Sequence, residues 1–195
     1  MAALKILVIP GSLRSGSHNV KLAAVGAYEF ARAGAEVTRI SLGDFPLPIY
    51  DGDLQARSGV PKNAVNLKRM IASHHGVLLV TPEYNSSVPP LVKNAIDWIS
   101  VVREHGEPPL SAFANRIFAL GGASAGRSGV LASLLSLRQV LSVGCRALVL
   151  AEPVRVPNAA SAFDDMAELK DAQTAEELRL VMRRLVEAAS LLAGE

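Results

Sequence analysis

The sequence predicts a doubly wound α/β fold, with a five-stranded parallel sheet covered by helices on both faces. Short apolar runs alternate with longer helical patterns five times along the chain, which is typical of a parallel sheet. Four of the five runs are nearly continuous in Val, Ile and Leu, as in strands that are buried on both faces. With right-handed crossovers, five such strands fit the order 2-1-3-4-5.

Each expected element has its own range in the sequence. The strands are Leu4–Ile9, Val37–Leu42, Gly76–Val80, Arg116–Leu120 and Cys145–Ala151. The second of these is mixed with polar residues, so we expect it at an edge of the sheet. The helices are Asn19–Arg32, Lys62–Ser73, Leu91–Val102, Val130–Val143 and Ala175–Leu192.

Three connections carry further signals. Thr174 stands three residues before Glu177, which is the capping-box spacing and predicts the start of the last helix. Glu104–Ala112 and Glu152–Asp171 are long and marked by Gly or Pro. Long loops in a compact domain are often functional, and a plain surface excursion is the alternative.

Composition limits the class of protein. A chain of 195 residues that is 50% hydrophobic and 19% charged predicts one globular domain, residues 1–195, rather than disorder. The net charge is +2 without any basic run, so we expect no nucleic-acid partner. No apolar stretch is long enough to span a membrane. The single cysteine, Cys145, lies in an apolar run and is expected to be buried and inert. We therefore expect a soluble, cytoplasmic protein.

The first candidate site is the loop after the first strand, because such sheets bind ligands at the carboxyl ends of their strands beside the switch point. Three serines surround Arg14 there and a helix follows, whose N-terminus attracts anions. The glycine pattern of dinucleotide sites and the lysine of triphosphate loops are both absent from this loop. Hydroxyl and N–H groups converging on one point suit a terminal monophosphate. The alternative is a serine-rich turn that only caps the helix.

The second candidate site is the loop after the third strand, which prolines stiffen. It offers a flat surface and N–H donors to a flavin ring, with Asn85 at the ring edge and Tyr84 giving a face or a hydroxyl. The alternative is a proline-ordered turn with its tyrosine buried for packing. The position of this loop opposite the serine loop favours the flavin.

Three motifs together resemble the NADPH-dependent FMN reductase family, which includes bacterial quinone, azo-dye and chromate reductases. They read GSLRxGSxN over Gly11–Asn19, TPEYN over Thr81–Asn85 and KNAIDW over Lys93–Trp98. The resemblance covers nearly the whole chain in the right order. It implies a flavodoxin-like fold, FMN phosphate on the first loop, the flavin ring on the second, and assembly into dimers or tetramers with FMN near the interface.

The loop after the fourth strand, Gly121–Ser128, is a near miss to a triphosphate loop, with Arg127 in place of the lysine. It is better interpreted as a glycine-rich wall that lets a flavin or nicotinamide lie close. His74 and His75 have no partner at metal-ligand spacing, so no metal is expected. The expected FMN-binding residues are Ser12, Arg14, Ser17, His18, Asn19, Pro82, Glu83, Tyr84, Asn85, Ser86, Ser124 and Gly126.

The expected activity is electron transfer from NADPH or NADH through FMN to a small acceptor, which is a quinone, an azo compound, a metal oxyanion or a free flavin. Both substrates would use one flavin face in turn, in a ping-pong pattern. The cofactor carries this chemistry, so no catalytic side chain is assigned. The alternatives are a flavodoxin-type electron carrier and a flavin-binding redox regulator. Electron carriers are generally acidic, whereas the isoelectric point here is about 8.9.

The expected partner besides the small-molecule acceptor is a second copy of the chain, in a homodimer or homotetramer. Closed two-fold dimers dominate among soluble oligomers. We expect the apolar helix Leu91–Val102 and the loop Glu104–Ala112 to lie at or near the two-fold interface.

Overall fold

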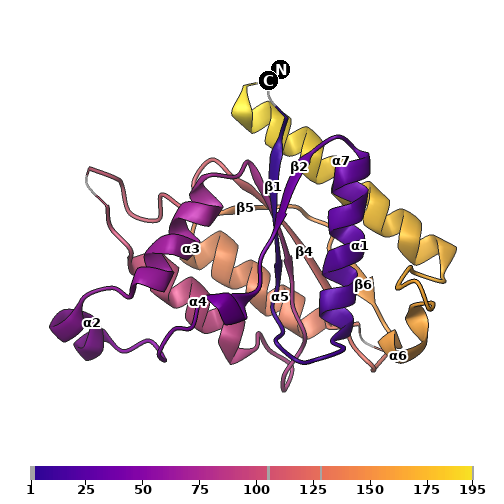
Figure 1. Ribbon diagram of the computed structural model, residues 1–195, viewed down its shortest axis with the longest axis horizontal. Helices are drawn as coiled ribbons and strands as arrows, with labels where there is room; N and C mark the ends of the chain where they lie inside the picture. Colours follow the sequence, from indigo (N-terminus) through magenta and orange to yellow (C-terminus); the bar gives the residue numbers. More distant parts are fainter. Residues whose placement is uncertain (1–2, 105, 128, 195) are drawn as a thin grey trace.

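A computed structural model describes residues 3–104, 106–127 and 129–194 (Figure 1). One parallel sheet forms the centre, in the order β2-β1-β3-β4-β5, and β6 pairs with β4 off this path. The predicted order 2-1-3-4-5 is therefore confirmed. The strands are β1 Lys5–Pro10, β2 Glu36–Arg39, β3 Gly76–Val80, β4 Ile117–Ala123, β5 Leu148–Val149 and β6 Val154–Val156.

The helices cover both faces of the sheet, with α1 and α7 on one face and α3, α4 and α5 on the other (Figure 1). All five expected helices are present within a few residues of their predicted bounds, whereas the shorter elements η1, α2 and α6 were not expected. The last turns of the fourth expected helix form a π-helix, η2. The bounds are α1 His18–Arg32, η1 Leu42–Asp44, α2 Gly52–Ser58, α3 Lys62–Ala72, α4 Pro90–Val101, α5 Leu131–Gln139, η2 Val140–Gly144, α6 Ala159–Ala162 and α7 Ala172–Ala193.

Alternating side chains of the inner strands pack into two separate hydrophobic cores, one on each face of the sheet. Ile6 and Val8 of β1 pack on the side of α1 and α7, whereas Leu7 and Ile9 pack on the side of α3, α4 and α5. Every residue of β3 and β4 is buried. This two-sided burial explains the continuous apolar runs in the sequence. β2, with exposed and half-buried residues, lies at the edge as expected.

The fifth strand departs from the prediction, because the expected run Cys145–Ala151 is divided. Only Leu148–Val149 pairs with the first half of β4, and β6 pairs with its second half. Pro153 lies between them and has no N–H to donate to a ladder. Leu148 is exposed, so β5 is an edge strand rather than a strand buried on both faces.

The start of the last helix also differs from the prediction. Asp171, not Thr174, is the N-cap of α7, and its carboxylate accepts hydrogen bonds from the backbone N–H and the hydroxyl of Thr174, both at 2.7 Å. Aspartate is as good an N-cap as threonine or better, so the helix begins three residues earlier. The long loop expected over Glu152–Asp171 contains β6 and α6.

The other long connection, Glu104–Ala112, is anchored to α3; His105 within it lies outside the residues that the structure describes. The Lys68 side chain is 3% exposed and its Nζ lies 2.8 Å from Glu104 and in contact with Glu107. Hydrogen bonds from Arg69 and Lys68 lower the pKa of the Glu104 carboxyl to about 2. This connection is thus tied to the body of the protein by charge pairs.

Two further expectations concern burial and membranes. Cys145 is buried as predicted, and burial raises the pKa of its thiol to about 11, which leaves it unreactive at neutral pH. Within the ranges given above, none of the helices combines the length and apolar character that crossing a lipid bilayer requires.

Candidate functional site

The loops after β1, β3 and β4 meet at one edge of the sheet, the lower edge in Figure 1. The register pairs Pro10 with Val80 and Val80 with Gly121, so the three strands end nearly level. Neighbouring strands are about 4.8 Å apart, which places the ends of β1 and β4 roughly 10 Å from each other across β3. The three loops therefore form one surface.

The loop after β1 both caps α1 and leaves donors free. Ser17 is the N-cap, is buried, and accepts a hydrogen bond from the Asn19 N–H at 3.2 Å. Ser12 is also buried. The N–H groups of Gly16 and His18 have no acceptor in the part of the chain that the structure describes. The capping role is thus real, and the same loop still offers hydroxyl protons and N–H groups to an anion.

His18 is the first residue of α1 and lies parallel to the ring of Phe163, with 6.2 Å between the ring centres. Its Nδ1 atom is buried and has no hydrogen-bond partner among residues 3–104, 106–127 and 129–194. Burial, together with the charges of Arg14 and Lys21, lowers the pKa of the imidazole, so the ring is neutral at pH 7. The local excess of positive charge comes from Arg14 and Lys21, neither of which has a carboxylate partner in the described chain.

Asn19, one of the expected FMN-binding residues, has its side chain bound to the backbone of β4. Its side chain is buried and pairs with the backbone of Ala123: Nδ2 donates to the carbonyl oxygen at 2.9 Å, and Oδ1 accepts from the N–H at 2.8 Å. The amide group therefore clamps the start of α1 to the end of β4. Asn19 positions the loop through this clamp.

The loop after β3 forms a tight turn. Tyr84 and Ser87 exchange two backbone hydrogen bonds of 3.1 Å, and Asn85 and Ser86 between them have φ of 51° and 60°. Positive φ at both central residues is the pattern of a type I′ turn, in which asparagine is favoured. Tyr84 is 52% exposed, so the alternative of a tyrosine buried for packing is wrong. The N–H groups of Asn85 and Ser86 meet no acceptor in the described chain.

Glu83 and Pro82 connect this loop to α5. The Glu83 carboxylate accepts from the Ser133 N–H at 3.0 Å, and the Ser133 hydroxyl donates to the Pro82 carbonyl at 3.0 Å. The N-cap of α5, Val130, has no side-chain acceptor to offer, so Glu83 supplies the cap from a distant loop. Ser133 was not expected at this site, and no signal in the sequence links it to Pro82.

β4 extends to Ala123, so Gly121 and Gly122, which the sequence predicts in the following loop, lie in the strand, and Gly122 is required by packing. A Cβ atom on Gly122 would clash with the carbonyl oxygen of Thr81 and with the Val130 side chain. The Ser124 hydroxyl donates to the Gly126 carbonyl at 3.3 Å, and Ser128 lies outside the described residues. Gly122 is thus required by the close approach of Thr81 and Val130 to this end of β4, whatever ligand the following loop meets.

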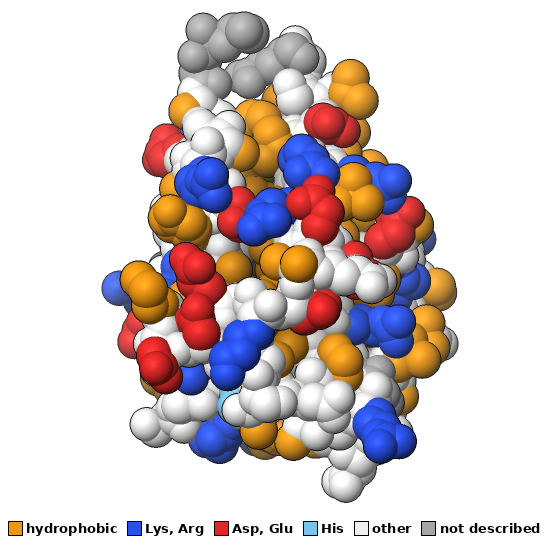
Figure 2. All heavy atoms as spheres, turned by 90° about the vertical axis from the view of Figure 1, so that its right-hand side faces the viewer, with side chains coloured by type: hydrophobic (Ala, Val, Ile, Leu, Met, Phe, Trp, Pro, Cys, Tyr) orange, Lys and Arg blue, Asp and Glu red, His pale blue; other side chains and the backbone are white. Residues whose placement is uncertain are grey.

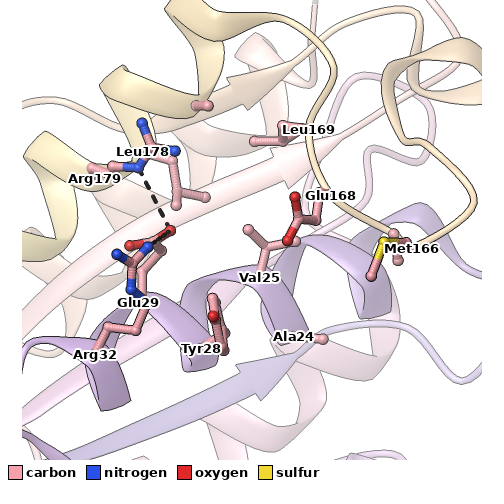
Figure 3. A pocket seen from close by; sticks show the side chains of 12 residues that line it. Ala24, Val25, Tyr28, Glu29, Arg32, Met166, Glu168, Leu169, Leu178 and Arg179 are labelled. Atoms are coloured by element: carbon pink, nitrogen blue, oxygen red, sulfur yellow. Dashed lines mark ion pairs between the residues drawn. The ribbon is translucent and has the colours of Figure 1, made fainter.

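One groove and its charges lie away from this edge. A groove of about 340 Å³ lies between α1, α7 and residues 166–169, where Glu29 forms ion pairs with Arg32 and Arg179 (Figure 3). The face over α1 and α7 carries basic and acidic side chains interspersed with apolar ones (Figure 2). Across the described ranges, no group of three or more His, Cys, Asp and Glu side chains is placed to hold a metal ion.

Comparison with known proteins decides the family. The family model for NADPH-dependent FMN reductases matches residues 4–161. The chain belongs to the NADPH-dependent FMN reductase family. It is 35% identical over 190 residues to an NAD(P)H-dependent FMN reductase of Pseudomonas aeruginosa, an alignment that covers 93% of this chain and 97% of that protein. The family resemblance inferred from the three motifs is confirmed.

Two further relatives agree with this family. A 2-hydroxy-1,4-benzoquinone reductase of Burkholderia is 38% identical over 138 residues, which are 71% of this chain and 70% of the relative. The solved structure of FerB, an NAD(P)H:(acceptor) oxidoreductase from Paracoccus denitrificans, superimposes with a TM-score of 0.78 at 29% identity and covers 97% of this chain and 98% of its own. As a member of the NADPH-dependent FMN reductase family, the chain is a flavin enzyme that uses FMN and NAD(P)H, and its flavodoxin-like fold is confirmed.

The clamp of Asn19 on Ala123 generates a prediction about stability. Asn19→Ala leaves two buried backbone groups without partners, each at a cost of about 1–3 kcal/mol, so the free energy of unfolding should fall markedly in urea denaturation. Asn63→Ala is the matched control, because the Asn63 side chain donates a single exposed bond to Pro46. Equal losses in the two variants would contradict a clamp at Asn19.

Proposed function

We propose that this chain binds FMN with its phosphate at the start of α1 and its ring against Pro82–Ser86, and passes electrons from NAD(P)H to a quinone by a ping-pong mechanism. The observation that carries the proposal is the juxtaposition of these two loops. Counting partners among the described residues, one loop presents free N–H groups, serine hydroxyls and two cations without a carboxylate partner, and the other presents a half-exposed tyrosine and two free N–H groups. Bound FMN would supply the two-electron chemistry that side chains do not provide.

The residues of the first loop suit a phosphate dianion. The hydroxyls of Ser12 and Ser17 and the N–H groups of Gly16 and His18 are donors, and Arg14 adds a full positive charge. Within the described residues, the Arg14 side chain makes one hydrogen bond, of 3.3 Å to the carbonyl of Ser15, so it can turn toward a ligand at little cost. The neutral His18 ring can take up a proton when an anion binds beside it, because a nearby negative charge favours the charged imidazole.

The second loop suits the edge and the face of a planar ring. The type I′ turn holds the N–H groups of Asn85 and Ser86 in fixed positions, where they can donate to ring oxygen and nitrogen atoms. Glu83 and Ser133 brace that turn against α5. Such preorganised donors would stabilise negative charge on a reduced ring without any movement of the loop. Ser124 and Gly126, on the loop after β4, would form the opposite wall.

The electron acceptor is proposed from the relatives. The quinone reductase names of relatives from Escherichia coli and Burkholderia support a quinone. Azo compounds, metal oxyanions and free flavins are further acceptors that a single open ring face would admit. The cytoplasmic location expected from the sequence stays a prediction.

The proposed assembly is a closed two-fold dimer, alone or paired into a tetramer, and its interface includes α5. The interface expected over Leu91–Val102 and Glu104–Ala112 stays a prediction, and the outward side of α4 carries an ion pair between Lys93 and Asp97. Leu131 and Leu135, four residues apart on α5, are large apolar side chains that are exposed, and Val143 of η2 and Leu148 of β5 are exposed farther from the site. Exposed apolar side chains on one face of a helix, such as Leu131 and Leu135, favour a protein interface there.

The phosphate site predicts a difference between two flavins. The double change Arg14→Ala and Ser17→Ala should weaken FMN binding by roughly 100-fold or more, because each charge-assisted hydrogen bond contributes about 1.5–3 kcal/mol. Riboflavin lacks the phosphate, so its affinity should change little in fluorescence titrations.

The matched control for this experiment is the double change Arg57→Ala and Ser41→Ala. It also removes one exposed arginine and one serine that caps a helix, since the Ser41 hydroxyl accepts from the Gly43 N–H at 3.2 Å. Equal losses of FMN and riboflavin affinity in the Arg14 and Ser17 variant would place the phosphate elsewhere.

The shared ring face predicts a kinetic pattern. Steady-state oxidation of NADPH at several fixed quinone concentrations should give parallel lines in double-reciprocal plots, and excess quinone should inhibit by competing with NADPH. Intersecting lines would mean that both substrates bind at once. If the protein holds FMN but oxidises no NADPH, the electron-carrier alternative is correct.

The assembly predicts a variant that separates the subunits. At micromolar concentration, light scattering should give at least twice the mass of one chain, and Leu135→Glu should shift the protein toward the monomer by placing a charge in the apolar interface. Leu191→Glu, at an 80% exposed position on α7, is the control and should leave the mass unchanged. A monomeric unmodified protein would contradict the proposal.

A further inference from the structure

Two arginines at the ligand edge of the sheet have no partner in the described part of the chain. Arg127 lies in the loop after β4 and Arg155 in the middle of β6, and both are exposed. Neither makes a hydrogen bond or an ion pair with any residue that the structure describes. Other arginines nearby are engaged: Arg138 donates to backbone carbonyls, and Arg184 pairs with Glu152.

The backbone holds these two arginines on neighbouring segments. Arg155 is in register with Gly122 of β4, and a Cβ on Gly129 would lie 3.4 Å from the Cβ of Arg155. Residues 124–126 and 156–159 are joined by hydrogen bonds, among them Ala159 N–H to the Ser124 carbonyl at 2.8 Å and Asn158 N–H to the Gly126 carbonyl at 3.2 Å. Arg127 directly follows this joined pair of segments, and Arg155 directly precedes it.

Acidic side chains on these elements do not neutralise the two charges. Glu152, in the short connection before β6, forms an ion pair with Arg184, and the Glu83 carboxylate accepts a hydrogen bond from the N–H of Ser133. Two uncompensated guanidinium groups attract anions, and their planar donor geometry matches the oxygens of a phosphate monoester. The feature therefore favours a ligand with a phosphate dianion.

We propose that Arg127 and Arg155 bind the 2′-phosphate of NADPH and make the enzyme prefer NADPH to NADH. This inference rests on the proposed function, in which the FMN phosphate occupies the start of α1. Val154 and Val156 pack into the core on the side of α1 and α7, so Arg155 between them points to the opposite face of the sheet, and a separate anion is needed to meet these arginines. The 2′-phosphate is the dianionic group that distinguishes the two coenzymes, and two guanidinium charges balance it.

The test compares the two coenzymes in arginine variants of the FMN-loaded enzyme. Arg127→Ala and Arg155→Ala together should lower kcat/KM for NADPH by roughly 10- to 100-fold, mainly through KM, because charge-assisted hydrogen bonds are lost. The value of kcat/KM for NADH, measured with the same quinone, should change less than about twofold, since NADH lacks the 2′-phosphate that accepts these bonds. Arg57→Ala also removes one exposed, unpaired arginine, but from α2, and should change neither value.

A binding measurement separates this inference from the proposed function. Calorimetry with adenosine 2′,5′-bisphosphate and adenosine 5′-monophosphate needs no turnover. The unmodified protein should bind the bisphosphate more tightly, and the double variant should bind both alike. Equal losses for NADPH and NADH, or an unchanged preference for the bisphosphate, would overturn the 2′-phosphate site. Absence of coenzyme oxidation by the unmodified enzyme would overturn the proposed function, while the bisphosphate titration would still decide the site.

Discussion

The inner strands β1, β3 and β4 are buried on both faces, and the rest of the structure depends on this burial. Their side chains have no route to solvent along the strands, so nearly every one is apolar. Polar groups can enter only where a strand ends. Because parallel strands end together, the polar residues of three distant segments are brought to one edge, and there the family's cofactor chemistry becomes possible.

The loops after β1 and β3 are held in place by contacts that have more than one role. Ser17 caps α1 and faces the edge where an anion would bind, and Glu83 caps α5 while bracing the turn at Tyr84. Both polar atoms of the Asn19 side-chain amide are hydrogen-bonded to the backbone of Ala123. The preorganisation of the candidate site is therefore supplied by the same bonds that complete the ends of helices and strands. A loss of stability and a loss of ligand geometry would come from the same substitution.

Local patterns were enough to predict the sheet order, the five main helices and the three loops at the ligand edge. Continuous apolar runs and helical spacing are patterns among residues that are close in the sequence, so they could be recognised without the structure. The roles of Asn19 and Glu83 could not be read in this way, because their partners are 104 and 50 residues away. The division of the fifth strand depends on Pro153 and on the Arg138 guanidinium, which come from different elements.

The Arg138 guanidinium also affects the edge of the sheet at β5. Arg138 donates to the carbonyls of Val149, Leu150 and Ala151, at 3.4, 2.6 and 2.8 Å. These are acceptors that a bare margin would offer to a strand from another molecule. With its carbonyls occupied and its ladder cut to two residues, β5 is a poor template for further strand addition. The β5 edge of the sheet thus resists the edge-to-edge pairing of strands through which misassembled β-structure grows.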